Sequence, residues 1–487
     1  MDILGKKWYD LERFVCRFCD VGKVDRMDTQ RETEQSAAEE VRNPRGNMTE
    51  GNPVKCMLTF AVPMILGNLF QQFYNIMDSV IVGKLVGSDA LAAVGASTSI
   101  TMLFVMVALG TGIGCSVVIS QLFGARQIEK MKSAISTALM SIVVISLALA
   151  VLGRFLSRWI LAWMGTPEEI FDPAATYLNI YFYGFFFLFL YNAFSAVFNA
   201  LGDSRKPLYF LMVSSLLNIC LDLLFVGRFQ WGVAGAAWAT LIAQAVSSAL
   251  SFTVLTFKLK RLECGEYKRY DRALLGKMTR VAIPTIVQQS MVSIGMLLIQ
   301  SVVNRFGPVF MAGYTAAVRI DGIAIVPMVN TGNAVSTFVA QNMGAGKPQR
   351  AKQGYHIGLC MAVGIGVLIG VLLFFFGNAF VNAFMDSDKD AASIAVGVEY
   401  LGVVSMFYFV MGAMNVTNAV LRGAGDMRWF MAVTLANLIV RVVLTYALSD
   451  ITAGRIIMWA NPIGWTVGLV LAYIRYRQGK WKKLTLI

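Results

Sequence analysis

Long apolar runs recur along this chain from Cys56 to Tyr476. A helix of about 20 apolar residues is long enough to cross the hydrocarbon core of a bilayer. Charged residues make up only 15% of the chain, against about 25% in soluble globular domains. We therefore predict an all-α integral membrane protein with twelve transmembrane helices. Their approximate ranges are 56–82, 91–120, 132–152, 173–200, 207–227, 233–257, 278–304, 311–341, 353–376, 392–421, 428–448 and 455–476.

Lysine and arginine are unevenly divided between the loops that join these runs. If the loops alternate between two sides, one side holds the basic loop from Lys258 to Arg280 and the basic tail from Arg475 to Lys483. The other side holds few positive residues. Positive residues stay cytoplasmic, which predicts a multi-pass protein of the plasma membrane with both termini inside. The formal net charge of +13 is then a topology signal that also favours anionic lipid, and we expect no nucleic-acid partner.

Residues 1–51 contain no apolar run long enough to span a membrane and are rich in polar and charged residues. Such a composition cannot bury enough apolar surface to fold, so we expect a disordered cytoplasmic tail. Met48 opens the stretch MTEGNPVKCMLTF, and one hypothesis is that residues 1–47 are a dispensable upstream extension. Cys16 and Cys19 form a C-x-x-C pair, which we interpret as incidental because a zinc site would need a second ligand pair.

The two halves of the chain carry an internal repeat. ISQLFGARQIEKMK, from Ile119, matches VAQNMGAGKPQRAK, from Val339, and LGDSRKP at Leu201 matches AGDMRW at Ala424. An even number of crossings in each half gives both halves the same orientation, which is a parallel repeat typical of transporters with a substrate path between the halves. The predicted parts are the tail 1–51, a six-helix lobe at 52–257, a basic cytoplasmic linker at 258–277, a second six-helix lobe at 278–477 and a basic cytoplasmic tail at 478–487.

Three stretches resemble the MATE (multidrug and toxic compound extrusion) transporters. They are AVPMILGNLFQQFYNIMDSVIVGKLVGSDALAAVGAS, GNAVSTFVAQNMGAGKP and LGDSRKP, and the resemblance extends from about Met48 to Tyr476. It implies two lobes arranged in a V that open alternately to the two sides of the membrane. It also implies export of cationic, amphipathic, drug-like molecules in exchange for H⁺ or Na⁺, with no other cofactor. We expect a monomer that is not an enzyme.

The stretch QQFYNIMDSVIVGK, Gln71 to Lys84, places a carboxylate, Asp78, inside the first predicted helix. A charge within the membrane is costly, so such a residue marks a functional site more often than a packing position. The polar residues of this helix are three and four apart, so they form one stripe. They are Asn68, Gln71, Gln72, Asn75, Asp78 and Ser79. For the amide side chains, hydrogen bonds between helices are an equal alternative.

The fifth predicted helix supplies a second carboxylate in SLLNICLDLLF, where Asn218 and Asp222 lie four residues apart on one face. Thr240, in the sixth helix, adds a hydroxyl. Carboxylate and amide oxygens suit Na⁺, whereas two nearby carboxylates cannot both ionise at low cost and would hold H⁺. In one branch of the MATE family the first lobe holds a cation. The resemblance implies that role for Asp78, Asn218, Asp222 and Thr240, although Thr240 alone would fit ordinary packing equally well.

The second lobe departs from this pattern. Where the first lobe has its Asn–Asp pair, the second has Asn437 and Arg441. Asp321, in the eighth helix, lies close in sequence to Arg319, and we interpret the two as a structural or gating pair. Arg441 is an alternative partner for Asp321 across helices. The residues that we expect to line the cavity are Gln72, Asn75, Asn192, Gln288, Arg319 and Asp321.

Two other functions are alternatives. A flippase for lipid-linked oligosaccharides shares the two-lobed architecture, but its anionic substrate calls for several basic residues inside the cavity. Only Arg319 and Arg441 lie well inside the predicted helices. A membrane-embedded enzyme ranks lower, because the sequence has neither an H-E-x-x-H nor a G-x-S-x-G motif. A phosphate-binding loop for ATP is absent as well. Nothing in the sequence separates Na⁺ from H⁺ as the coupling ion.

Overall fold

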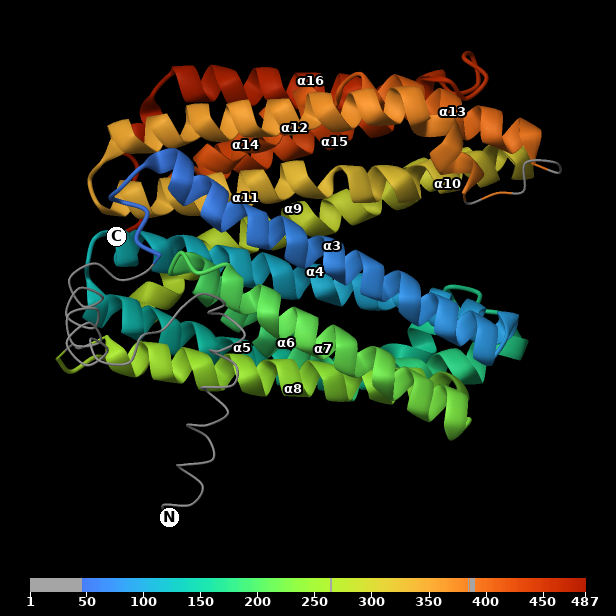
Figure 1. Ribbon diagram of the computed structural model, residues 1–487, viewed down its shortest axis with the longest axis horizontal. Coiled ribbons are helices and arrows are strands. Elements are labelled where there is room, and N and C mark those ends of the chain that lie inside the picture. The colour runs from blue at the N-terminus through green and yellow to red at the C-terminus, as the bar shows by residue number, and fades with distance from the viewer. Residues whose placement is uncertain (1–45, 263–264, 384, 386–389) are drawn as a thin grey trace, which may run out of the picture. The chain divides into compact units, whose positions relative to one another are not determined.

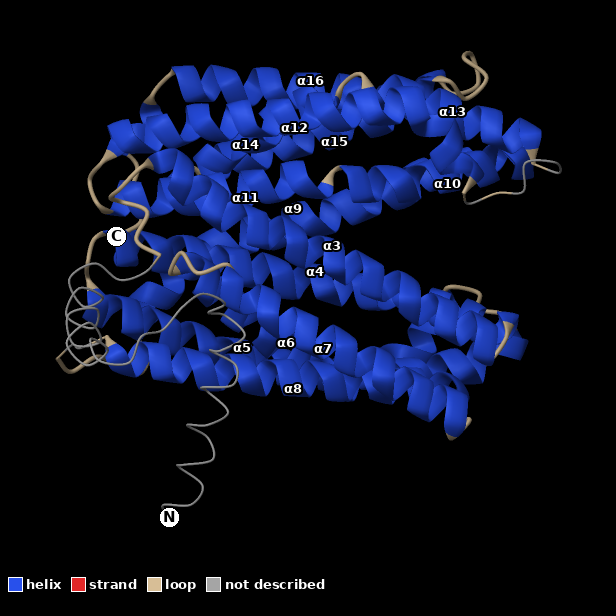
Figure 2. Cartoon of the chain, viewed as in Figure 1, coloured by secondary structure: helices blue, strands red, loops and turns tan. Residues whose placement is uncertain are grey.

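The computed structural model describes residues 46–262, 265–383, 385 and 390–487. In these residues the chain forms helices joined by short turns, and they contain no strand (Figure 2). The predictions for residues 1–45, including the interpretation of Cys16 and Cys19, lie outside the described residues.

The helices of the first half are α3 (Pro53–Leu85), α4 (Ser88–Gly124), α5 (Ile128–Trp163), α6 (Glu168–Ala200), α7 (Arg205–Asp222), the π-helical segment η1 (Leu223–Arg228) and α8 (Gly232–Arg261). Those of the second half (Figure 1) are α9 (Arg272–Val303), the short 3₁₀ segment η2 (Asn304–Phe306), α10 (Gly307–Ala324), α11 (Val326–Gly344), α12 (Pro348–Asn382), α13 (Ala391–Ser405), α14 (Tyr408–Ala424), α15 (Met427–Leu448), α16 (Ile456–Arg477) and the 3₁₀ segment η3 (Lys480–Lys483).

The lengths of these helices fit a protein that spans a membrane many times. Among the described residues, 10 stretches are long and apolar enough to cross, and the pair α13–α14, bent by 52°, makes 11. The longest stretch, Arg272–Gly344, has 73 residues and turns at η2 and Gly307, where φ is +84°. A crossing needs only about 20 residues, so this stretch makes two. The predicted all-α membrane protein with twelve crossings is confirmed.

The helices pack as two bundles, one from each half of the chain (Figure 1). In the first bundle α4 and α8 pack against α6, and α3 packs against α7. In the second bundle α14 packs against α11, α12 and α16, and α15 packs against α16. The bundles meet where α9 and α11 contact α4 and where α11 contacts α3. The predicted two-lobed architecture is therefore confirmed.

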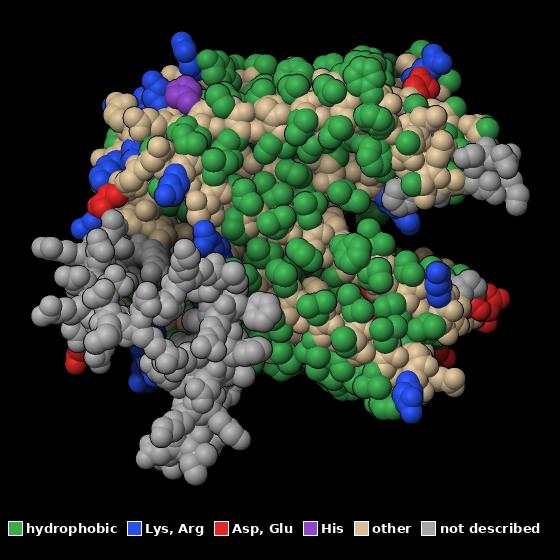
Figure 3. Space-filling model, viewed as in Figure 1, with side chains coloured by type: hydrophobic (Ala, Val, Ile, Leu, Met, Phe, Trp, Pro, Cys, Tyr) green, Lys and Arg blue, Asp and Glu red, His purple; other side chains and the backbone are tan. Residues whose placement is uncertain are grey.

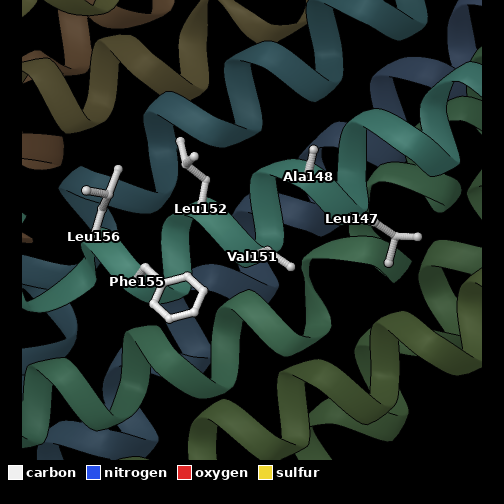
Figure 4. A pocket seen from close by; sticks show the side chains of 6 residues that line it. All are labelled: Leu147, Ala148, Val151, Leu152, Phe155 and Leu156. Atoms are coloured by element: carbon white, nitrogen blue, oxygen red, sulfur yellow. The ribbon is translucent and has the colours of Figure 1, made fainter.

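Large apolar side chains cover the outer sides of both bundles (Figure 3). Phe155, Trp163 and Phe375 are 80%, 78% and 72% exposed, which suits positions that face acyl chains. Figure 4 shows a shallow hollow on α5 that belongs to this surface, since every side chain lining it is apolar. The lining residues are Leu147, Ala148, Val151, Leu152, Phe155 and Leu156.

Three irregularities occur in the helices that carry the intramembrane acids. Pro63, inside α3, removes one backbone hydrogen bond of the helix that carries the first of these acids. The π-helical segment η1 begins directly after Asp222, and π turns in helices are frequent at functional sites. α10 and α11 are separated at Ile325, four residues after Asp321. The last two breaks therefore lie within about one helical turn of an acid.

Candidate functional site

Two carboxyl groups meet inside the first bundle. Asp78 lies on α3, and α7 ends at Asp222. Because α3 packs against α7, the two side chains come within interaction distance of each other. An ionised carboxylate only accepts hydrogen bonds, so the two groups can bond to each other only when one of them carries a proton. Two acids that occupy one site are expected to share a proton in this way.

Asn218 and Thr240 complete this group. Asn218 lies one turn before Asp222 on α7, and Thr240 lies on α8, which packs against α7. With its amide nitrogen toward Asp222, Asn218 donates to Asp222 Oδ2 at 2.9 Å and accepts from the backbone N–H of Thr240 at 3.2 Å. In the opposite orientation the amide nitrogen lies 3.4 Å from Thr240 Oγ1, and the amide oxygen faces only acceptors. The structure thus places all four predicted coupling residues together.

Each carboxyl group also keeps one oxygen without a protein partner. Asp78 Oδ1 and Asp222 Oδ1 are buried, and no described residue donates a hydrogen bond to either. Buried polar atoms are almost always satisfied, so these oxygens point to a partner that is not protein: a proton, a water molecule or a cation. Carboxylate oxygens beside an amide and a hydroxyl are the hard ligands that hard cations prefer.

Three tyrosines that the sequence analysis did not single out surround the carboxyl pair. The Tyr74 hydroxyl lies close to the Thr240 side chain. Tyr177 and Tyr181, on α6, stack with their ring centroids 6.2 Å apart, and Tyr177 lies within electrostatic reach of Asp78. Spacing could have found them, since Tyr74 precedes Asp78 by one turn and the two α6 tyrosines are one turn apart.

The other candidates of the first bundle, and one on α9, do not join the carboxyl pair. Asn192 donates to the Leu188 carbonyl in its own helix at 2.9 Å, which is a packing role. Gln72 and Gln288 are partly buried, and Asn75 is exposed. No described hydrogen bond connects any of these four side chains to the two carboxyl groups.

The second bundle holds a different arrangement. Asp321, on α10, accepts a hydrogen bond from the Tyr408 hydroxyl at 2.7 Å. The expected pairing with Arg319 is wrong, because side chains two residues apart on a helix do not face each other, and Arg319 is exposed. Arg441 lies within electrostatic reach of Asp321, but no ion pair joins them among the described residues. The partner of Asp321 is Tyr408.

The two bundles close against each other at the end that carries the C-terminus (Figure 1). Gln121 of α4 donates to the Gly423 carbonyl at 3.1 Å, and Gln341 of α11 donates to the Ala200 carbonyl at 2.9 Å. The internal repeat aligns the two glutamines, and it also aligns the two carbonyls. Each bundle therefore locks onto the other through the same contact, while at the opposite end Figure 3 shows a notch between the bundles.

Segments from near both ends of the chain complete this closure. The side-chain oxygen of Gln341 accepts from the backbone N–H of Met48, and that of Gln121 accepts from the backbone N–H of Leu486, each at 2.9 Å. Met48 is 3% exposed. Residues 46–51 are therefore packed into the contact between the bundles, and they do not form part of a free tail, because they supply partners for a buried glutamine.

Sequence comparison identifies relatives over nearly the whole membrane part. The MatE family matches residues 63–224 and 284–447, once in each bundle. Probable multidrug resistance protein YpnP of Bacillus subtilis (strain 168) is 32% identical over 449 residues, which cover 90% of this chain and 98% of that protein. Probable multidrug resistance protein YoeA of the same organism is 30% identical over 444 residues, covering 88% of this chain and 94% of that protein.

Solved structures show the same fold. A crystal structure of MATE in complex with MaL6 matches with a TM-score of 0.84 at 24% identity, covering 91% of this chain and all of the other. An outward-facing multidrug resistance MATE family transporter of the MOP superfamily matches with a TM-score of 0.83 at 23% identity, covering 90% of this chain and 98% of the other. This chain belongs to the MatE family, and it is a multi-span membrane transporter and not an enzyme.

Proposed function

We propose that this protein exports amphipathic, drug-like cations across the plasma membrane in exchange for H⁺ or Na⁺. Asp78, Asn218, Asp222 and Thr240 form the coupling site of this proposal. The observation that carries it is the pair of neighbouring carboxyl groups, with one unpartnered oxygen on each group, inside a membrane-spanning bundle. The Bacillus subtilis relatives, described as probable multidrug resistance proteins, support the class of cargo.

Coupling follows from the charge of the pair. With a proton between Asp78 and Asp222, the site carries one negative charge less and the bundle can pack closely around it. A Na⁺ ion among the same oxygens has a similar effect, and it would favour the Asn218 orientation in which the amide oxygen faces the acceptors. When neither ion is bound, two ionised carboxylates repel each other and require water or a cationic cargo.

The ion can drive export only through its difference in affinity between two conformations. A difference of about 1.4 kcal/mol changes the ratio of the two conformations tenfold. The contact of Gln121 and Gln341 with the opposite bundle holds one end closed in the described conformation. For cargo to enter from that side, these contacts must break, and the notch at the other end must close.

Lys and Arg side chains gather at the closed end, beside the C-terminus (Figure 3). Since positive residues stay cytoplasmic, we assign this end to the cytoplasm, which agrees with the cytoplasmic termini predicted from the loop charges. The described conformation then opens away from the cell interior. We propose that the protein works in this way as a monomer, because each chain contains both bundles.

The direct test of this function is transport by the purified full-length protein in liposomes. The cargo is the ethyl ester of rhodamine B, an amphipathic cation, and the gradients of pH and Na⁺ are imposed one at a time. We expect dye movement against its gradient only when at least one ion gradient is present. Movement that is equally fast after both gradients have been collapsed would overturn the proposal.

A further inference from the structure

The second bundle contains an intramembrane cation that forms no ion pair with any residue in the described part of the chain. Arg441 lies on α15 at the position that the repeat aligns with Asp222 of the first bundle. Its Nε is buried, and no described residue accepts a hydrogen bond from it. A guanidinium group has five N–H donors, and a charge at this depth is costly unless something pairs with it. The described part of the chain therefore provides no hydrogen-bond partner for this group.

The obvious protein partner is engaged elsewhere. Asp321 accepts the Tyr408 hydroxyl at 2.7 Å and feels Arg441 only through longer-range electrostatics. An arginine kept only to neutralise Asp321 would be expected in direct contact with it, because bidentate arginine–carboxylate pairs are the stable arrangement. Arg441 does not make that contact among the described residues.

The neighbouring helix is shaped to leave room for this arginine. A Cβ atom at Gly464, on α16, would lie 2.5 Å from Arg441 Cγ and 2.5 Å from Asn437 Oδ1. Asn437 Oδ1 is itself buried, and no described residue donates to it. Arg441 as a whole is only partly buried. The glycine thus gives Arg441 space beside an amide whose oxygen has no partner among the described residues.

Two tyrosines of the core of the second bundle lie near Arg441. Tyr314 and Tyr400 lie within electrostatic reach of Arg441, and their rings meet edge to face with centroids 5.4 Å apart. Asn461 donates to the Tyr400 hydroxyl at 2.8 Å, which fixes that ring in place. Both rings are buried, so neither is open to a ligand and Arg441 is the group left to receive one.

We propose that Arg441 is an anion-accepting subsite in the second bundle, which takes the carboxylate, sulfonate or phosphate group of an exported amphiphile. This inference rests on the proposed function, because the ligand is a cargo molecule. It extends the cargo from cations to molecules that also carry a negative group. A free inorganic anion such as chloride has the same charge chemistry, and the experiment separates the two.

The test compares rhodamine B with its ethyl ester, since the two dyes differ only in whether the carboxylate is free. Binding is measured by fluorescence anisotropy on the full-length protein in lipid nanodiscs. We expect Arg441→Gln to weaken rhodamine B binding about tenfold, because a charge-assisted hydrogen-bond pair is lost. Binding of the ester should change less than about twofold, which also shows that the variant is folded. Arg441→Lys should give an intermediate loss, because lysine keeps the charge without the planar fork.

The matched control is Arg455→Gln, which removes an exposed arginine of the same bundle that pairs with Glu399 at 3.3 Å. It should leave the binding of both dyes unchanged. Equal weakening of both dyes by Arg441→Gln, or unchanged rhodamine B binding, would overturn the proposal.

Replacing chloride with gluconate distinguishes a cargo anion from a free one. If chloride stabilises the wild-type protein through Arg441 while rhodamine B binding does not depend on Arg441, the subsite belongs to a free anion and the cargo assignment is wrong. If the proposed function fails, the failure shows instead in ester transport by the wild-type protein, a measurement that does not involve Arg441.

Discussion

At matching positions of one repeat, the two bundles carry opposite charges. The first bundle has Asn218 and Asp222, which lie beside Asp78. The second has Asn437 and Arg441, and its nearest acid is bound to a tyrosine. The helices that hold these residues are equivalent in the repeat, so the difference in charge comes from side chains and not from the fold. The exchange of Asp222 for Arg441 at one position of the repeat thus distinguishes the proposed cation site from the proposed anion site.

The closure between the bundles has kept the symmetry that the binding residues have lost. Gln121 and Gln341 each bond to a backbone carbonyl of the opposite bundle, at 3.1 and 2.9 Å, and each accepts from a segment near one end of the chain. Two lobes that rock against each other need matching contacts where they meet. They do not need matching ligands, because ion and cargo have different charges. The symmetric contacts therefore lie where the two bundles meet, and the residues that differ between the bundles are those proposed to bind ion and cargo.

The largest effect is expected for Asp222→Asn. The substitution keeps the shape of the side chain but removes a titratable group, so efflux of the rhodamine B ester should fall to that of liposomes without protein. Asp172→Asn is the matched control, because Asp172 is an exposed acid that pairs with Arg158 at 2.5 Å, and its efflux should stay near the wild-type rate. Full efflux by well-expressed Asp222→Asn protein would remove Asp222 from the coupling site.

The next largest effect is expected for Asp78→Ala, which is compared with Asp321→Ala in the second bundle. Asp78→Ala should reduce gradient-driven efflux far more than Asp321→Ala, since only Asp78 belongs to the proton-sharing pair, while Asp321 is held by a hydrogen bond from Tyr408. Efflux rates are compared at matched protein levels in the same liposomes. The reverse order would move the coupling site to the second bundle.

The symmetric contact predicts equal effects from two distant glycines. A Cβ atom at Gly124 would lie 1.9 Å from the Gln341 carbonyl oxygen, and one at Gly344 would lie 1.9 Å from that of Gln121. Gly124→Ala and Gly344→Ala should therefore each loosen the closed end to a similar degree. Hydrogen–deuterium exchange at the ends of α4 and α11 measures this.

The control for these glycines is Gly364→Ala, since a Cβ atom there meets nothing within 4 Å. It should leave the exchange at both helix ends unchanged. If only one of the two substitutions, Gly124→Ala or Gly344→Ala, raises exchange, the two contacts do not contribute equally to the closed end.

The smallest effect is expected for Tyr74→Phe. It removes a hydroxyl that lies close to the Thr240 side chain, and a hydrogen bond at such a position typically contributes about 0.5–1.5 kcal/mol. The apparent affinity for the coupling ion should fall about two- to tenfold while maximal efflux persists. Tyr183→Phe is the control, because Tyr183 is 59% exposed on α6. An unchanged ion affinity would exclude Tyr74 from the support of the site.

The crossings and the two bundles were predictable because they depend on patterns along the chain. A bilayer requires about 20 apolar residues for each crossing, and the matching motifs at Ile119 and Val339 reveal the duplication. An acid inside an apolar run is a functional-site candidate by its cost alone, which singled out Asp78 and Asp222 separately. Their grouping was predicted from the resemblance to the MATE family.

Contacts between distant helices were not predictable in the same way. The spacing of residues on one helix says which side chains share a face, but not which helix lies opposite. Sequence proximity therefore suggested Arg319 as the partner of Asp321, whereas the partner is Tyr408 on α14. Likewise, nothing in the polar composition of residues 46–51 indicated that Met48 would bond to a buried glutamine of α11.

The measurement that tests the coupling most directly is equilibrium binding of the rhodamine B ester to Asp78→Asn protein across pH and Na⁺ concentration. In the wild type, binding should weaken as the pH falls or Na⁺ rises, because either ion neutralises the carboxyl pair that attracts the cation. In Asp78→Asn the dye should still bind, but its affinity should no longer depend on either ion. A variant whose dye binding keeps the full wild-type dependence on pH and Na⁺ would show that Asp78 is not the group that couples ion to cargo.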